Sequence, residues 1–329
     1  MAFTPTTSSV DPKSLWTHNL YEQLIADVQA YLGAIDVSAD CDAPISLSKS
    51  HQHLSGGRNA INYFKNYFGP KDGSGDPLTD QQVKCVGGFG AVGAGAAEDA
   101  TEIMAAINDL PATGGVVILP PGTYNTGNVP INLAGTDNTR SNVTLTGFGD
   151  STVIKVGDNW DSSNPPIYFG ASSSTGMVLA NLMIDGNSAE QSTAHALVDF
   201  DTASESMIDN VYFYDSKGDG ADLGTGEENS IIGCRFEAID NTGITGTATE
   251  PNFIDSILIR NCKIEDCIYG IVGSGWRGCT IARNKIRGAR TYGIHLYSVQ
   301  NTASIKALSI VGNVITECGF GLLFEQKTS

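Results

Sequence analysis

The sequence is poor in charged residues, poorer still in cations, and contains no long hydrophobic run. Charged residues make up 17% of the 329, and 19 Lys and Arg stand against 36 Asp and Glu, which gives a formal net charge of −17. This deficit of positive charge argues against nucleic acid or an anionic membrane surface as a partner. No segment approaches the roughly 18 apolar residues of a membrane-spanning helix. The first residues lack a basic start followed by an apolar run, so no secretory signal peptide is expected.

Cysteine is also sparse and unpatterned. There are seven cysteines, and no two of them form a Cys-x-x-Cys pair. An odd number without clustered ligands predicts no zinc site. We interpret the cysteines as small buried side chains that fill corners of the fold, with a disulfide or an intermolecular bridge as the alternative.

The C-terminal half contains a degenerate repeat of about 26 residues. Each segment has a bulky apolar anchor followed six or seven residues later by glycine, whereas successive anchors are 22 to 29 residues apart. The anchors are Phe213, Phe236, Ile264, Ile286 and Ile315, and the glycines are Gly220, Gly243, Gly270, Gly293 and Gly321. Constant spacing within segments and variable spacing between them predicts strands in register joined by loops of varying length, which is a solenoid.

The residues within each repeat favour strands over helices. Segments 256–260 and 280–283 alternate apolar and polar residues, so alternate side chains point into one core. Asparagine recurs near the turn into the anchor strand, where it tolerates a left-handed corner and can pair with a copy one coil above. These asparagines are Asn181, Asn210, Asn261, Asn284 and Asn313. Three β-faces per coil fit best, because a leucine-rich consensus is missing and a sandwich would not keep the register. The predicted fold is all-β, a right-handed parallel β-helix.

Residues 83–124 resemble the start of the pectate-lyase-like superfamily. Phe89-Gly90-Ala91-Val92-Gly93 is followed by a helical stretch from Glu98 to Ile107 and then by Leu119-Pro120-Pro121-Gly122-Thr123-Tyr124. The resemblance extends to about residue 324 and implies a strand, a short amphipathic helix that caps the β-helix, and then the first coil. Pectate lyases, polygalacturonases, alginate epimerases and phage tailspikes share this start, so it indicates the fold and leaves the function open.

We expect residues 1–80 to form an anchoring and oligomerisation region and residues 81–329 to form the β-helix. Tyr21, Ile25, Val28 and Leu32 have coiled-coil-like spacing, which predicts a helix at about residues 12–32. That helix either packs on its own domain or lies at the axis of a homotrimer. The last coil is followed by few residues and by no predicted cap, so the β-helix is expected to be incomplete at its C-terminus or covered by a partner.

The densest polar run, residues 215–228, holds three candidate catalytic acids: Asp219, Asp222 and Glu227. Such a run suits Ca²⁺ or paired carboxylates for glycoside hydrolysis, or is a solvated loop. Beyond that Ca²⁺ alternative no cofactor or other metal is expected. Asp222 falls at the Asp of the Asp-Pro-His-Glu site of alginate-epimerase-like proteins, but Leu223-Gly224 replaces Pro-His. The repeat places the further candidate His295 three coils from Asp222, roughly 14 Å away, so the two form no dyad.

Two further groups are candidates for substrate binding. Tyr269 and Tyr292 stack on successive coils, either as a sugar platform or simply to stabilise the solenoid. Residues 260–290 hold a basic patch that would recognise an acidic saccharide, with an interface or plain surface role as the alternative. The binding candidates in the patch are Lys263, Lys285, Arg287 and Arg290, and Arg283 is a candidate base or carboxylate clamp for β-elimination.

These features favour a phage virion spike that binds host surface polysaccharide. If the spike is an enzyme, it would also degrade that polysaccharide. The spike would be a homotrimer that contacts other virion proteins through residues 1–80, located at the particle surface. As an enzyme it would be a polysaccharide lyase or a glycoside hydrolase. The alternatives are a free extracellular lyase, epimerase or hydrolase, and a purely structural particle component.

Overall fold

The computed structural model describes residues 83–327 except for residue 163 and the segments 171–173, 249–252 and 300–304. The predicted N-terminal helix, its trimer axis and the anchoring role of residues 1–80 lie outside the described residues. Among those described, no helix is both long and apolar enough to cross a membrane.

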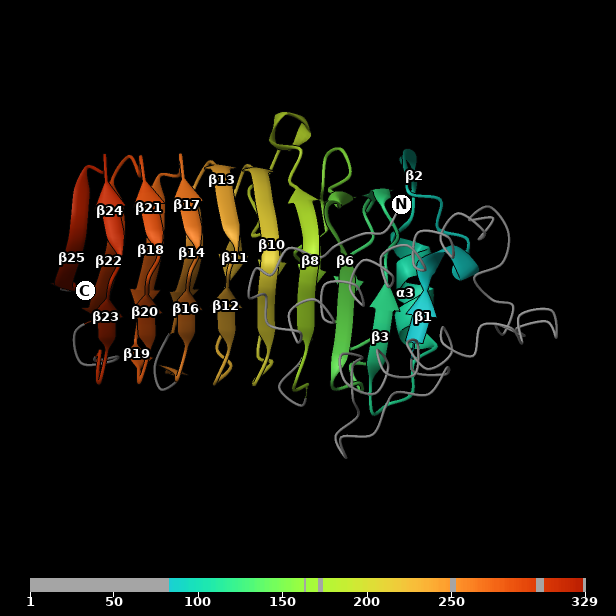
Figure 1. Ribbon diagram of the computed structural model, residues 1–329, viewed down its shortest axis with the longest axis horizontal. Helices are drawn as coiled ribbons and strands as arrows, with labels where there is room; N and C mark the ends of the chain where they lie inside the picture. The colour runs from blue at the N-terminus through green and yellow to red at the C-terminus, as the bar shows by residue number, and fades with distance from the viewer. Residues whose placement is uncertain (1–82, 163, 171–173, 249–252, 300–304, 328–329) are drawn as a thin grey trace, which may run out of the picture. The chain divides into compact units, whose positions relative to one another are not determined.

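The described chain is a parallel β-helix whose coils stack along one axis (Figure 1), as the repeat predicts. One face holds β1 (Val83–Cys85), β3 (Gly115–Ile118), β12 (Ser230–Ile232), β16 (Leu258–Arg260), β20 (Thr280–Ala282) and β23 (Ser309–Val311). The next face holds β2 (Ala94–Glu98), β4 (Gly122–Asn125), β13 (Arg235–Ile239), β17 (Lys263–Glu265), β21 (Lys285–Arg287) and β24 (Val314–Thr316). Three long strands run through both faces, namely β6 (Val143–Lys155), β8 (Val178–Asp185) and β10 (Met207–Ser216).

The third face is an eight-stranded parallel sheet. Its strands are β5 (Ile131–Asn132), β7 (Ile167–Tyr168), β9 (Val198–Asp199), β11 (Ala221–Asp222), β14 (Thr242–Thr247), β18 (Tyr269–Ser274), β22 (Tyr292–Val299) and β25 (Phe320–Lys327). The remaining elements are the strand pair β15 (Ile254–Asp255) and β19 (Trp276–Arg277), the 3-10 helices η3 (Val86–Phe89) and η4 (Ser188–Glu190), and α3 (Ala100–Asn108). Three β-faces per coil are thus confirmed.

The apolar anchors of the repeat stack on one another inside the coils. Phe213 pairs with Phe236, and the column continues through the isoleucine anchors of β17, β21 and β24. The rings of Phe213 and Phe236 are parallel, with centroids 4.4 Å apart. Both are fully buried, and burying such a side chain contributes roughly 1.5–3 kcal/mol. The predicted register is therefore confirmed.

The repeated glycines are required by close packing between coils. A Cβ atom added to Gly270 would lie 2.3 Å from the carbonyl oxygen of Gly293 and 2.8 Å from a methyl group of Ile286. A Cβ on Gly220 would lie 2.6 Å both from the carbonyl oxygen of Gly243 and from the ring of Phe236. No side chain fits where the backbone of one coil passes so close to the next, so glycine recurs before β11 and in β14, β18 and β22.

Three of the recurrent asparagines form left-handed corners as predicted. Asn181, Asn210 and Asn261 have φ angles of 53°, 53° and 57°. The amide of Asn210 donates to the Asn181 side-chain oxygen at 3.0 Å, so two of these corners are tied across coils.

The corner prediction is wrong for Asn284 and Asn313, because the preceding residues, Arg283 (φ 56°) and Gly312 (φ 66°), take the left-handed conformation. The two amides form a ladder, with Nδ2 of Asn284 3.0 Å from Oδ1 of Asn313. Oδ1 of Asn284 also accepts the backbone N–H of Cys262 at 2.8 Å. These side chains satisfy backbone groups at the corner instead of shaping it.

Four of the cysteines described here are buried and none is in a disulfide. They are Cys234, Cys262, Cys267 and Cys279. Burial raises the pKa of Cys267 to about 12 and that of Cys279 to about 11, so neither forms the reactive thiolate readily. The interpretation as small buried side chains is confirmed for these four.

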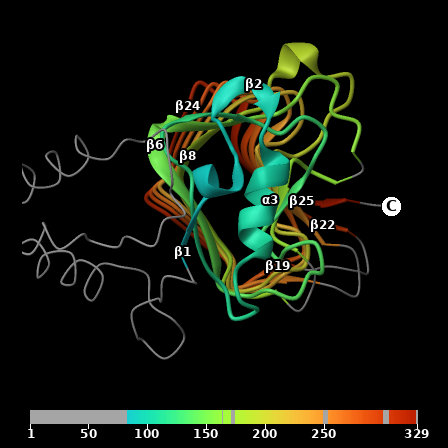
Figure 2. The same cartoon turned by 90° about the vertical axis from the view of Figure 1, so that its right-hand side faces the viewer.

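Helix α3 closes the N-terminal end of the described coils (Figure 2). Its buried residues Ile103, Met104 and Ile107 belong to the same hydrophobic core as the strands. Before the helix, Asp99 Oδ1 accepts the N–H of Val92 at 2.8 Å and so fixes the preceding turn. The capping helix implied by the superfamily resemblance is confirmed.

Candidate functional site

The outer row of the eight-stranded sheet carries the polar side chains of the candidate site. Parallel pairing places one residue of each strand in this row, and from β5 to β22 the residues on either side of it are buried. In order from β5 to β25 the row reads Asn132, Tyr168, Asp199, Asp222, Thr245, Val272, His295 and Leu323. The positions from Asp222 onward are those that the repeat predicts. Asn132, Tyr168 and Asp199 extend the row by three coils.

Four aspartates gather on β9 and β11 and in the residues beside them; Asp199, Asp201, Asp219 and Asp222 are here called the carboxylate cluster. Asp199 and Asp222 are direct partners on adjacent strands, whose spacing is about 4.8 Å. Each of the two belongs to the outer row, so their carboxyl groups leave the sheet on the same side.

Backbone amides hold three of these carboxylates in place. Oδ1 of Asp199 accepts the N–H of Asp201 at 2.6 Å, and Oδ1 of Asp222 accepts that of Gly224 at 3.0 Å. Oδ1 of Asp219 accepts the N–H of Thr242, on the next coil, at 2.8 Å. A bond of this kind orients the acid and leaves its second oxygen for other partners.

The cluster holds its protons more tightly than isolated aspartates do. Burial, followed by the negative charges of Asp199 and Asp219, raises the pKa of Asp222 to about 7, although the N–H of Gly224 opposes the shift. Burial also raises the pKa values of Asp199, Asp201 and Asp219. Near neutral pH a protonated Asp222 therefore lies beside a second carboxyl group, which is the arrangement needed for paired acid and base chemistry.

Tyr168 borders the cluster on the next coil toward β5. Burial and the charge of Asp201 raise the pKa of its phenol, while a hydrogen bond with Asn132 lowers it. The phenol therefore stays protonated at neutral pH, where it can donate a hydrogen bond at the edge of the cluster.

Further along the same face lies a cavity of about 390 Å³, here called the aromatic cavity. Its lining includes Thr242, Tyr269, Tyr292, His295, Tyr297 and Glu325. The predicted tyrosine stack is present, with the rings of Tyr269 and Tyr292 5.9 Å apart at an interplanar angle of 19°. Since Thr242 also bonds Asp219, the cavity adjoins the carboxylate cluster.

His295 forms part of the floor of the aromatic cavity. Its ring is 4.6 Å from that of Tyr292 and 5.2 Å from that of Tyr297, and the residue is 6% exposed. Nε2 lies 3.1 Å from Oε1 of Glu325, another residue that lines the cavity. Strands β14 and β18 separate His295 from Asp222, which confirms that the two residues form no dyad.

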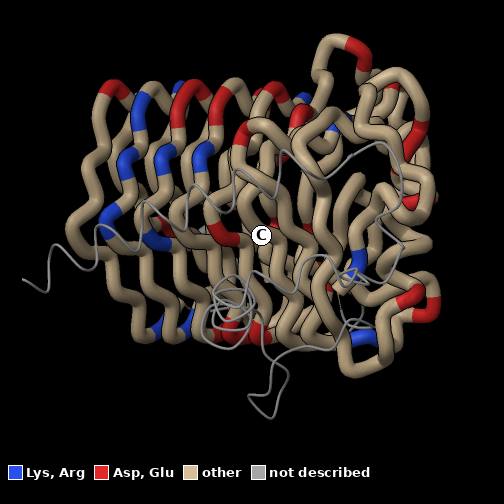
Figure 3. Tube along the Cα trace, turned by 45° about the vertical axis from the view of Figure 1, so that its right-hand side comes forward, with Lys and Arg blue, Asp and Glu red and all other residues tan. Residues whose placement is uncertain are grey.

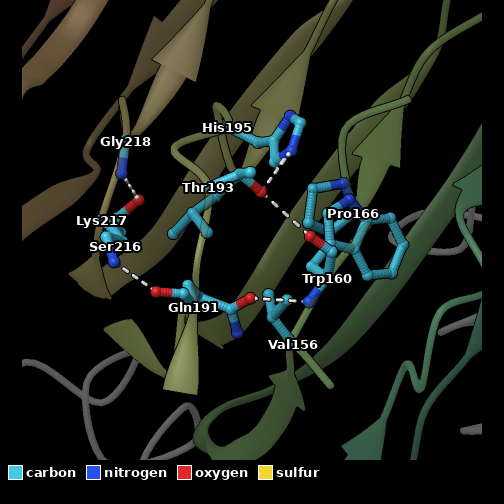
Figure 4. Close-up of a pocket in the computed structure, with 11 residues that line it drawn as sticks. Val156, Trp160, Pro166, Gln191, Thr193, His195, Ser216, Lys217 and Gly218 are labelled. Atoms are coloured by element: carbon cyan, nitrogen blue, oxygen red, sulfur yellow. Dashed lines mark hydrogen bonds between the residues drawn. The ribbon is translucent and has the colours of Figure 1, made fainter. Parts of the chain in front are cut away.

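A second hollow lies in the loops that lead into β7, β9 and β11 (Figure 4). It measures about 20 Å³, which is room for roughly one water molecule. Gln191 accepts the N–H of Trp160 at 2.9 Å through Oε1, and its carbonyl oxygen accepts a hydrogen bond from Lys217. Thr193 and His195 are joined at 3.0 Å. These contacts tie neighbouring loops together, and the hollow is too small for a sugar.

The predicted basic patch lies on other strands than the carboxylate cluster. Lys263 and Lys285 are partners on β17 and β21, and Figure 3 shows Lys and Arg recurring on successive coils. Several of these cations have acidic partners: Lys263 pairs with Glu265, and Nε of Arg287 is 3.1 Å from Glu317. Arg290, beyond β21, is 3.7 Å from Asp240.

Besides His295, two predicted catalytic residues lie apart from the cluster. Glu227 is exposed in the turn after β11, where its N–H donates to Ser204. Arg283 is exposed at the corner between β20 and β21. The structure thus brings together Asp219 and Asp222, and adds Asp199 and Asp201, which the sequence reasoning missed. The signal for these two was the alternation Val198-Asp199-Phe200-Asp201.

Calcium binding stays a prediction from the sequence. Within the described part of the chain, no three His, Cys, Asp or Glu side chains are placed so as to hold a metal ion together.

The described coils define a right-handed parallel β-helix, and comparisons with known proteins agree. The family model for a right-handed β-helix region matches residues 196–329. The chain is 38% identical over 105 residues to mannuronan C5-epimerase AlgE5 of Azotobacter vinelandii, an alignment that covers 30% of this chain and 10% of the epimerase.

Solved structures share the fold as well. The pre-mature gene product 12 of bacteriophage phi29 matches with a TM-score of 0.63 at 19% identity, over 83% of this chain and 36% of the phage protein. An N-terminal fragment of the same phage protein matches with a TM-score of 0.54, over 73% of this chain and 43% of the fragment. The chain thus has the right-handed β-helix fold of these proteins, and it spans only part of their length.

Proposed function

We propose that this chain is a polysaccharide-binding spike component of a phage particle that cleaves glycosidic bonds at the carboxylate cluster. The observation that carries the proposal is the pairing of Asp199 with Asp222 on adjacent strands, beside an aromatic cavity on the same face. A half-buried acid pair next to a cavity lined by tyrosines is suited to hold and hydrolyse a sugar chain.

The spacing of the pair selects a retaining mechanism. Carboxyl groups on adjacent parallel strands start about 4.8 Å apart, near the roughly 5–5.5 Å of retaining glycosidases. Asp222, with its pKa raised to about 7, donates a proton to the leaving glycosidic oxygen, while the carboxylate of Asp199 attacks the anomeric carbon. Water, deprotonated by Asp222, then releases the sugar from Asp199 and restores both groups.

The aromatic cavity supplies binding energy away from the reacting bond. Tyrosine combines an apolar ring with a hydrogen-bonding hydroxyl, which suits the apolar and polar groups of a sugar. Tyr269 and Tyr292 lie two and three coils from β11, so a chain that crosses the coils would contact both tyrosines and the carboxylate cluster.

The particle-bound part of the proposal has separate support. The fold is shared with a phage protein, and the spacing of residues 21–32 predicts an oligomerising helix. We propose a homotrimer that contacts other virion proteins through residues 1–80. Light scattering of the full chain should give three times the chain mass of 34.6 kDa. A monomer at micromolar concentration would count against the spike.

A second candidate function is epimerase or lyase chemistry on a uronate polymer. It is favoured by the 38% identity to a mannuronan C5-epimerase over 105 residues. Proton NMR of mannuronan after incubation would reveal epimerised residues, and absorbance of unsaturated uronate would reveal a lyase. Either signal would replace hydrolysis as the reaction.

Hydrolysis is tested by reducing-end release from a panel of neutral, amino and acidic polysaccharides. Wild-type protein should release ends from at least one, and Asp199→Asn and Asp222→Asn should each lose at least a hundredfold in rate. Glu228→Gln removes one exposed carboxylate outside the cluster and should keep the wild-type rate. Equal activity in all four proteins would exclude the pair as the catalytic groups.

A further inference from the structure

The corner that follows β16 and β20 holds an arginine in a backbone conformation that favours other residues. In-register pairing aligns one corner residue on each coil from β8 to β23. These residues have φ angles between 53° and 66° and are, in order, Asn181, Asn210, Gly233, Asn261, Arg283 and Gly312. Asparagine and glycine tolerate this left-handed conformation, whereas a long side chain adopts it at a cost. A residue kept in a costly conformation is a candidate for a functional role.

Further cations surround Arg283 on two adjacent coils. Arg260 ends β16 and is the strand partner of Ala282, which precedes Arg283. Lys263 and Lys285 are direct partners on β17 and β21. The four cations Arg260, Lys263, Arg283 and Lys285 are here called the basic corner. Like charges on adjacent strands repel one another, so the stability of the fold does not explain this arrangement.

Three of the four cations, Arg260, Arg283 and Lys285, are exposed and form no ion pair with any described residue. The fourth, Lys263, is paired with Glu265. The hydrogen bond from Lys263, supported by the charges of the neighbouring cations and opposed by burial, lowers the pKa of Glu265, as expected in a positive potential. A chain of net charge −17 thus presents cations without counter-charges at this corner.

The carboxylate cluster of a neighbouring copy is badly placed to supply those counter-charges. A three-fold axis along the coils would hold all copies of a homotrimer at the same height. Strand β9 lies three coils before β17, and β11 lies three coils before β21, which is roughly 14 Å along the axis. This offset exceeds the Debye length of about 8 Å at physiological salt, so a separate anionic partner fits the corner better.

The spacing of the cations suits a linear polymer of modest charge density. Lys263 and Lys285 are one strand spacing apart, about 4.8 Å, and the Cα atoms of Arg283 and Lys285 are at most about 7 Å apart. These steps are similar to the length of one sugar unit, which separates the charges of an acidic polysaccharide. Duplex DNA presents one charge per about 1.7 Å of its axis, a density that the corner does not match. Arginine also binds carboxylate groups through two parallel hydrogen bonds.

We propose that the basic corner is a second polysaccharide site, which holds acidic sugars without cleaving them. The corner borders β17 and β21, on a different face from the carboxylate cluster, so the site does not depend on hydrolysis at that cluster. Several weak sites of this kind on one homotrimer would bind the same polymer together and so lengthen its retention.

Calorimetry of the full chain with an oligogalacturonate and with its fully methyl-esterified form tests the proposal. The two oligomers share one backbone, and only the first is charged. We expect the acidic oligomer to bind roughly tenfold more tightly, as for the gain of a hydrogen bond between charged groups. Its affinity should fall as salt is raised.

Arg283→Asn and Lys285→Gln locate the site. Each should weaken binding of the acidic oligomer roughly tenfold, because each removes a charged hydrogen-bond donor. Arg283→Asn also supplies the residue of the preceding corner, Asn261, so its melting temperature should equal or exceed that of wild type. Lys155→Gln is the matched control: it makes the same change of charge five coils before β21 and should leave the affinity unchanged.

Several outcomes would overturn the proposal. Equal affinity for the methyl ester would show that charge is not recognised, and tighter binding of an oligonucleotide of equal length would assign the corner to nucleic acid. A loss of both affinity and melting temperature in Arg283→Asn would make this arginine structural.

One further variant separates the basic corner from the proposed hydrolase. Asp222→Asn should keep the affinity for the acidic oligomer, and a loss of affinity in this variant would place the binding at the carboxylate cluster instead. If no polysaccharide is cleaved while the acidic oligomer still binds in an Arg283-dependent way, hydrolysis is wrong and the second site stands.

Discussion

Replacing Asp222 with asparagine should stabilise the protein at alkaline pH while abolishing its proposed chemistry. An aspartate whose folded-state pKa is raised binds its proton more tightly in the folded than in the unfolded state. Below the unfolded pKa of 3.8, Asp222 therefore does not change the free energy of unfolding. As the pH rises toward 7 it lowers this free energy, and above 7 the loss stays constant. Asparagine, which carries no charge at any pH, removes that penalty.

The magnitude follows from the shift. A change from 3.8 to about 7 corresponds to roughly 4 kcal/mol at 1.36 kcal/mol per pKa unit. The shape of the side chain is kept, and the asparagine Oδ1 can still accept the N–H of Gly224. At pH 8 the free energy of unfolding of Asp222→Asn should therefore exceed that of wild type by up to roughly 4 kcal/mol, and the gain should vanish near pH 3.8.

Urea unfolding at a series of pH values measures this difference. Glu228→Gln serves as the control, because an exposed surface substitution changes stability by no more than about 0.5 kcal/mol. A variant that is equally stable as wild type at pH 8, or less stable, would refute the argument that Asp222 is held in a buried, repulsive site. A gain of the same size at every pH would show that charge is not its cause.

The remaining predictions concern packing, corners and binding. Gly270→Ala should lower stability by roughly 1–3 kcal/mol in thermal unfolding, because its Cβ would meet the next coil; an unchanged melting temperature would contradict the packing argument. Asn284→Ala should cost roughly 1–3 kcal/mol by leaving the N–H of Cys262 without its acceptor, and a neutral result in urea unfolding would contradict this. Tyr292→Ala should weaken oligosaccharide binding in calorimetry at least fivefold while Tyr292→Phe keeps it, since the ring face and not the hydroxyl makes the contact; equal losses would assign the effect to the hydroxyl. The thiol of Cys262 should react with a thiol reagent only after unfolding, and rapid labelling of the folded protein would refute its burial.

The fold could be predicted from the sequence because one physical constraint repeats in successive coils from β11 to β22. Glycine is needed where the backbones of neighbouring coils nearly touch, and an apolar anchor is needed inside each coil. Phe236 and Gly243 are one such pair, and the structure keeps their register with the coils on either side. From this register alone the stacking of Asp222, His295 and the tyrosines could be predicted.

The repeat in the sequence did not indicate two residues of the carboxylate cluster, Asp199 and Asp201. In the coil of β9 the position aligned with Gly220 is occupied by Leu197, since Val198 pairs with Ala221. The coil of β9 therefore lacks the glycine that marks each repeat. The first recognisable repeat is the next coil, which contains Gly220 and comes after Asp199 and Asp201 in the sequence. The raised pKa of Asp222 depends on burial and on a neighbour 23 residues away, and neither can be derived from a single repeat.

The basic patch was recognised from composition, but its charge partners were not. Glu317 reaches Arg287 from the following coil, 30 residues away, so the ion pair is a product of the stacking. The sequence indicated where cations gather, whereas the structure shows that they lie on different strands from the carboxylate cluster.

The most direct test of the account is the rate of reducing-end release, measured with binding affinity for the same oligosaccharide, in wild type and Asp199→Asn. The variant should lose cleavage by at least a hundredfold while it still binds the oligosaccharide through the aromatic cavity. A variant that cleaves at the wild-type rate would contradict the assignment of the Asp199 and Asp222 pair as the reacting groups.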